Sequence, residues 1–264
     1  MPAPLAHLSF ATLWQPSIIA QAVIVQVLYL LVVYRFGKRV FRGYRPVEPA
    51  RVVSFLAGMW VFYFAFGSPF DYVADHLLFS VHMVQHLCEI LLMVPLLMYG
   101  VPPWLLEPLV AGERGQAARR VFHPIVNIAV FNVIFFGFHL PVLYDLALRS
   151  EAFHFFEHAM FFVGGLFLWM PVFSPVEAIP RLDPGPQVLY MFFAGNLAMP
   201  LEIILVFAQR PFYPFYNHVP RLFGLSPLAD QQLGFAIMAV AMFAAFFAVA
   251  VRAYVRYDNV ALYE

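Results

Sequence analysis

The sequence contains seven apolar runs, each close to the length of about 20 residues that an α-helix needs to cross the hydrocarbon core of a bilayer. They cover residues 17–34, 52–67, 77–99, 125–144, 153–173, 188–208 and 233–251. Hydrophobic residues make up 63% of the chain and charged residues only 11%, whereas a soluble domain is about half apolar and about a quarter charged. We therefore predict an all-α integral membrane protein, a bundle of about seven transmembrane helices that forms a single polytopic membrane domain over residues 1–264.

The basic residues predict the orientation of this bundle. Twelve of the 15 lysines and arginines fall on one side of the predicted spans, and only Arg149, Arg210 and Arg221 fall on the other. Because cytoplasmic loops carry the excess of Lys and Arg, the N-terminus is predicted to lie outside and the C-terminus in the cytoplasm. Tyrosines at the ends of spans (Tyr34, Tyr99 and Tyr144) are expected in the interfacial aromatic belt.

Several functional classes are disfavoured by the same composition. The formal net charge is +0, so nothing indicates a nucleic-acid partner, and membrane lipid is the expected surrounding. The lone cysteine, Cys88, allows neither an intrachain disulfide nor a paired-thiol metal site. No GxxxxGK[ST] phosphate-binding loop occurs.

The histidines gather on the predicted outer side. Eight of the 9 map there, and only His123 falls on the cytoplasmic side. The eight are His7, His76, His82, His86, His139, His154, His158 and His218. On an ideal helix, Glu89 shares a face with His82 and His86, and Asp71 and Asp75 extend that stripe if the helix begins early enough. Ionisable residues at membrane depth are costly and are candidates for function.

Two of these histidine pairs have the spacing of a metal site. His82 and His86, like His154 and His158, are four residues apart and so face the same side of a helix. We predict a metal site formed by both pairs together with His139. The candidates for a further ligand, or for a partner that orients the ligands, are Asp75, His76, Glu89, Glu157, Asp230 and Gln231. Imidazole and carboxylate donors suit copper(II), zinc or iron.

Other interpretations of the polar residues remain open. Haem would need one axial histidine from each helix, and a proton relay or a structural hydrogen-bonding network would use the same residues. Thioether ligation of copper(I) is a further alternative, although methionines that fill gaps between helices are the simpler expectation. The methionines concerned are Met83, Met191, Met199, Met238 and Met242.

Four stretches resemble the CtaG family of cytochrome c oxidase assembly factors. They read SVHMVQHLCEILLMVPLLMYGVPP (80–103), FHLPVLYDLAL (138–148), FHFFEHAMFFVGGLFLW (153–169) and SPLADQQLGFAIM (226–238). The family's motifs correspond to His82 and His86, His139, Glu157 and His158 preceded by His154, and Asp230, Gln231 and Gln232. This chain departs from the usual family pattern at Phe138, Phe235, Ala239 and Cys88, where candidate ligands are not affected.

The resemblance implies a role in the biogenesis of a caa3-type terminal oxidase in a bacterial inner (plasma) membrane. The expected function is assembly rather than small-molecule turnover. A metal, with copper favoured, would be held near the outer face and passed to an oxidase subunit, with a periplasmic copper carrier as a further candidate partner. The rival interpretation is a zinc- or iron-dependent membrane hydrolase or oxygenase that acts on lipid, with Glu157 or Asp230 as general base. A haem-binding electron carrier is a third, and a proton-coupled transporter is disfavoured because the polar residues stop at one side.

Overall fold

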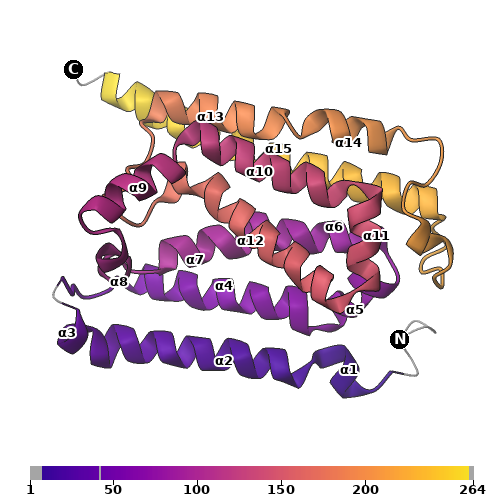
Figure 1. Ribbon diagram of the computed structural model, residues 1–264, viewed down its shortest axis with the longest axis horizontal. Coiled ribbons are helices and arrows are strands. Elements are labelled where there is room, and N and C mark those ends of the chain that lie inside the picture. The colour runs from indigo at the N-terminus through magenta and orange to yellow at the C-terminus, as the bar shows by residue number, and fades with distance from the viewer. Residues whose placement is uncertain (1–7, 42, 262–264) are drawn as a thin grey trace.

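The computed structural model describes residues 8–41 and 43–261, the side chains to residue 257, and in this part of the chain it is entirely helical apart from connecting loops (Figure 1). His7 lies outside the described residues. The elements are α1 (Phe10–Trp14), α2 (Pro16–Leu31), η2 (Val32–Phe36), α3 (Gly37–Val40), α4 (Pro49–Gly67), α5 (Pro69–His76), α6 (Phe79–Leu87), η3 (Cys88–Met93), α7 (Val94–Gly100), α8 (Pro103–Leu106), η4 (Glu107–Val110), α9 (Glu113–Val121), α10 (Pro124–His139), α11 (Pro141–Arg149), α12 (Glu151–Phe173), α13 (Pro184–Asn196), α14 (Met199–Val206), η5 (Pro214–Asn217) and α15 (Pro227–Ala261).

Six segments of the described chain are long and apolar enough to cross a membrane, and a seventh is formed if α9 and α10 count as one span bent by 54°. The six are Phe10–Val40, Pro49–Gly67, Phe79–Gly100, Glu151–Phe173, Pro184–Val206 and Pro227–Tyr257. The prediction of an all-α membrane bundle is therefore confirmed, with six or seven spans. Its orientation stays a prediction that rests on the distribution of arginine and lysine.

Two predicted spans are shorter than the apolar runs that suggested them. The third begins at Phe79 because Leu78 is extended (φ −135°, ψ 118°), so α5 is a separate helix and Asp75 does not share a helix with His82. The fourth ends at His139 because Leu140 is extended (φ −67°, ψ 131°) immediately before Pro141, and a residue before proline avoids the helical region. The chain after Leu140 forms the separate helix α11.

The third span contains a π-helical segment, η3, just before Pro95. Proline lacks the N–H that an α-helix needs, and a wider turn accommodates the loss. Trp169 of α12 donates its indole N–H to the carbonyl of Ile90 at 2.6 Å, and Ser54 of α4 donates to the carbonyl of Leu96 at 2.8 Å. The missing N–H of Pro95 leaves an acceptor on the preceding turn without its helical partner, and the bond from Trp169 satisfies the carbonyl of Ile90 there. The bond from Ser54 joins α4 to the same span.

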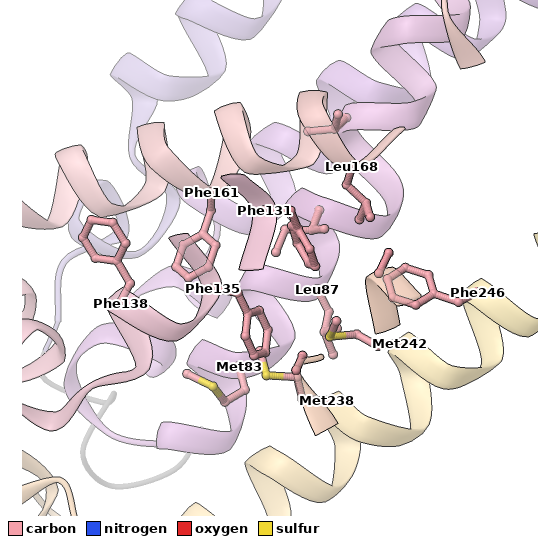
Figure 2. Packing of buried hydrophobic residues seen from close by; sticks show 14 of the residues in the cluster. Met83, Leu87, Phe131, Phe135, Phe138, Phe161, Leu168, Met238, Met242 and Phe246 are labelled. Atoms are coloured by element: carbon pink, nitrogen blue, oxygen red, sulfur yellow. The ribbon is translucent and has the colours of Figure 1, made fainter. Parts of the chain in front are cut away.

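The main apolar core lies between α6, α10, α12 and α15, where Figure 2 shows phenylalanines interleaved with methionines. Met83, Met238 and Met242 are at most 3% exposed and belong to this cluster, as does Met191, whereas Met199 is 39% exposed. The expectation that most of these methionines fill gaps between helices therefore agrees with their packing.

The two ends of the bundle differ in character. α1, α5 and α11 gather at one end, whereas α3, α8, α9 and the C-terminal part of α15 gather at the other (Figure 1). Arg51, in the first turn of α4, donates to the carbonyl of Tyr99 at 2.8 Å and stacks on its ring. The histidine-bearing segments approach one another toward the first end.

Candidate metal centre

Two helices supply most of the polar cluster. His82 and His86 lie one turn apart on α6, and His154 and His158 lie one turn apart on α12, with Glu157 between them. The ring centroids of His82 and His158 are 5.7 Å apart, and those of His86 and His158 are 5.0 Å apart. The two HxxxH pairs therefore face each other, as their helical spacing predicted.

Potential metal donors fall into two groups of side chains. In each group, one nitrogen or oxygen atom per residue lies within 4.8 Å of the others. The first group is His82, His154, Glu157 and His158, and the second group is His86, Glu89 and His158. His158 stands in both because its ring lies between them: Nδ1 is 3.0 Å from Glu89 Oε2, and Nε2 is 3.0 Å from His154 Nε2.

Several atoms of this cluster have no hydrogen-bond partner among the described residues. They are both nitrogens of His82, both nitrogens of His86, Nε2 of His139 and both carboxylate oxygens of Glu157. His82, His86 and Glu157 are 0% exposed. An unsatisfied buried polar group costs about 1–3 kcal/mol, so a fold that collects several of them in one place is suited to a bound ion that would satisfy them together.

His139 is oriented toward the same region from α10. Its Nδ1 donates to the carbonyl of Phe135 at 2.6 Å, which fixes the tautomer and leaves the lone pair of Nε2 free. Its ring centroid is 5.9 Å from that of His86, and His139 belongs to neither donor group. The structure therefore brings His139 next to the cluster, where its role as a ligand stays a proposal.

The acidic residues of α5 lie at the edge of the cluster. Asp75 Oδ1 is 3.6 Å from His82 Nδ1 and 3.5 Å from His154 Nε2. Asp71 accepts hydrogen bonds from the side-chain amides of Gln15 and Gln85. Burial and repulsion from Asp75 raise the pKa of Asp71 to about 8, against the opposing effect of those hydrogen bonds.

His76 lies outside both donor groups. It is exposed, its ring stacks on Tyr72 at 4.4 Å, and its Nδ1 is 3.2 Å from the carbonyl of Tyr72. It therefore does not join the donor groups in the structure.

Asp230 and Gln231 of α15 bind backbone groups rather than the cluster. The two oxygens of Asp230 accept from the N–H groups of Phe79 at 2.8 Å and Ser80 at 3.0 Å, so this residue caps α6 from another helix. Gln231 accepts from the N–H of Phe212 at 2.7 Å and donates to the carbonyl of Leu205 at 3.2 Å. Asp230 thus supports the helix that carries His82 and lies outside both donor groups of the described residues.

Tyr144 differs most from its predicted place. It was expected in the interfacial belt, yet it is 0% exposed and its ring centroid is 5.2 Å from that of His82. It lies on α11, which turns back over the cluster after the break at Leu140, and its hydroxyl is 3.0 Å from that of Tyr216. The Pro141 that ends α10 was the only sequence signal for this turn.

A cavity of about 1020 Å³ opens beside the cluster. Its polar part is lined by Asp75, Glu89, His154 and His158, and its apolar part by residues of α2, α4 and α12 such as Met59 and Phe162. The cavity therefore gives both donor groups a path toward the end of the bundle that carries α5 and α11.

The chain resembles two curated mycobacterial proteins. It is 28% identical over 184 residues to "Uncharacterized protein Mb0105" of Mycobacterium bovis and, to the same extent, to "Uncharacterized protein MT0111" of Mycobacterium tuberculosis. Each match covers 63% of this chain and 25% of the relative, so the chain spans about a quarter of the length of these relatives. No solved structure matches the chain.

A family model agrees with the resemblance seen in the sequence motifs. The model of the cytochrome c oxidase caa3 assembly factors matches residues 27–257. This range includes both HxxxH pairs, His139 and the Asp230 cap. The chain therefore belongs to the Caa3_CtaG family, the cytochrome c oxidase caa3 assembly factors.

Proposed function

We propose that this chain supports the maturation of a caa3-type cytochrome c oxidase by holding a metal ion, with copper favoured, in the buried histidine and glutamate cluster. The ion is cargo in this proposal: it enters the cluster from the outer side of a bacterial plasma membrane and is passed to an oxidase subunit. A periplasmic copper carrier is the proposed donor. The observation that carries the proposal is the meeting of two HxxxH pairs around Glu157, in a member of an oxidase assembly family.

The donor set supports an ion of this kind. Imidazole nitrogens and carboxylate oxygens suit copper(II), zinc and iron, and the described cluster contains no thiolate. His158 donates its Nδ1–H to Glu89, and a metal-binding histidine commonly donates its second N–H to a carboxylate in this way. The other nitrogen, Nε2, then faces His154 in the first group.

Access to the cluster supports a transfer role. His154 has a side chain that is 19% exposed, whereas His82 is fully buried behind it. Both His154 and His158 line the cavity. An ion that entered through the cavity would meet His154 and His158 before His82 and His86, which is a stepwise path from a partly open pair to a closed pair.

The test is oxidase maturation in cells that carry His82→Ala/His86→Ala in place of the natural gene. We expect loss of caa3 oxidase activity and of its copper while the variant remains in the membrane at the natural level. His218→Ala, which changes an exposed histidine outside the cluster, is the matched control and should leave maturation intact. Full oxidase activity in the double variant would refute the proposal.

The cavity also favours a second candidate, a metal-dependent hydrolase or oxygenase that acts on lipid. Its apolar lining between α2, α4 and α12 is chemically suited to an acyl chain, and Glu157 would serve as general base. Zinc- or iron-loaded protein that converts a fluorescent phospholipid, with the activity lost in Glu157→Gln, would favour this function. The assembly proposal expects no such turnover.

A further inference from the structure

The carboxylate of Glu157 faces two different histidines. Its Oε2 is 4.0 Å from His82 Nε2, and its Oε1 is 3.9 Å from His86 Nε2. All three side chains are 0% exposed, and none of these four atoms has a hydrogen-bond partner among the described residues. The two oxygens therefore point at the first and the second donor group, respectively.

These separations fit an ion better than a hydrogen bond. Hydrogen bonds between nitrogen and oxygen are about 2.7–3.2 Å long, so contacts near 4 Å are too long. Zinc binds imidazole nitrogen and carboxylate oxygen at about 2.0–2.2 Å, which lets two ligands of one ion lie up to about 4 Å apart. Each of the two nitrogen–oxygen distances therefore leaves room for one ion bound by both atoms.

The donors also outnumber the ligands of a single four-coordinate ion. His86 and Glu89 are not within reach of the whole first group, and His82 and His154 are not within reach of the whole second group. Among the described residues His158 belongs to both groups: its Nε2 faces His154 in the first group, and its Nδ1–H donates to Glu89, a ligand of the second group. The cluster thus offers two neighbouring positions, connected through Glu157 and His158.

We infer that the cluster holds two ions side by side, one in each donor group, with the carboxylate of Glu157 bridging them. This inference rests on the proposed function and adds the number of ions to it. Two-metal sites hold their ions about 3.5–4 Å apart, and a carboxylate with one oxygen toward each ion fits that spacing. Such a centre would deliver or exchange a pair of ions rather than a single one.

The experiment counts copper in the full-length protein, purified in detergent, loaded with excess Cu(II) and desalted. We expect two ions for each wild-type chain, with an electron paramagnetic resonance spectrum broadened or silenced by coupling between them. His154→Ala removes a ligand that belongs to the first group, and Glu89→Gln removes a carboxylate ligand from the second group while its amide oxygen can still accept the His158 Nδ1–H. Each variant should retain one ion and show the spectrum of an isolated Cu(II).

Glu202→Gln is the matched control, because Glu202 is a buried carboxylate (5% exposed) outside both donor groups. It should still bind two coupled ions. One ion in the wild type, with an uncoupled spectrum, would overturn the inference and leave the proposed function intact. No bound copper in the wild type would refute both, and the wild-type result does not depend on whether any variant folds.

Discussion

Asp230→Ala tests whether a residue of the last helix fixes the start of the helix that carries His82. Asp230 is 1% exposed, and its carboxylate oxygens accept from the N–H groups of Phe79 and Ser80 at 2.8 and 3.0 Å. The alanine variant leaves both N–H groups without their partner. Each buried unsatisfied donor costs about 1–3 kcal/mol, so we expect a loss of about 2–6 kcal/mol in the free energy of unfolding.

The free energy of unfolding can be measured by titrating the protein in dodecyl maltoside with sodium dodecyl sulfate. Asp183→Ala is the matched control, because Asp183 stands at the N-terminus of α13 and its side chain makes no capping hydrogen bond. That change should stay within about 0.5 kcal/mol of the wild type. Hydrogen exchange at Phe79 and Ser80 should also accelerate in Asp230→Ala. An Asp230→Ala protein as stable as the Asp183→Ala control, with unchanged exchange at these amides, would refute the capping argument.

Two further stability predictions use the same assay. Gly100→Ala should destabilise the protein by about 1–3 kcal/mol, because the added Cβ would lie 2.6 Å from the backbone nitrogen of Phe55. Gly137→Ala is the control and should be neutral or stabilising, because a Cβ there would have no atom within 4 Å. Equal effects of the two changes would contradict the close contact between the helices at Gly100. The pKa of Asp71 is raised to about 8 in the folded protein, so its carboxyl group stays protonated there above about pH 4, where the unfolded chain loses that proton. The free energy of unfolding should therefore fall as the pH rises between about 4 and 8. Asp71→Asn should reduce that slope, and an unchanged slope would show that Asp71 does not titrate in this range.

The spans and the facing of the HxxxH pairs were accessible from the sequence because each depends on local pattern. Apolar runs give the spans, and a spacing of four residues places His82 with His86 and His154 with His158 on one helix face. That the two faces meet follows from their shared depth in the bundle. Glu157 joins these histidines because it lies between His154 and His158 on the same helix.

The parts that sequence reasoning missed depend on contacts between distant segments. The partners of Asp230 lie about 150 residues away along the chain, so its role as a cap of α6 has no local signal. Tyr144 is buried because α11 folds back after Leu140, which periodicity alone does not reveal. The separation of α5 from α6 lies at the extended backbone of Leu78, and Asp230 caps α6 from the last helix.

The proposal that the buried cluster holds copper can be tested by the metal content of the protein as isolated from its own membrane, measured by elemental analysis. The wild type is compared with His82→Ala/His86→Ala and with His218→Ala. We expect copper in near-stoichiometric or greater amount in the wild type and the His218→Ala control, and its loss in the double variant. Copper retained undiminished by the double variant, or a wild type that binds no metal even after reconstitution, would show that the cluster does not hold the ion.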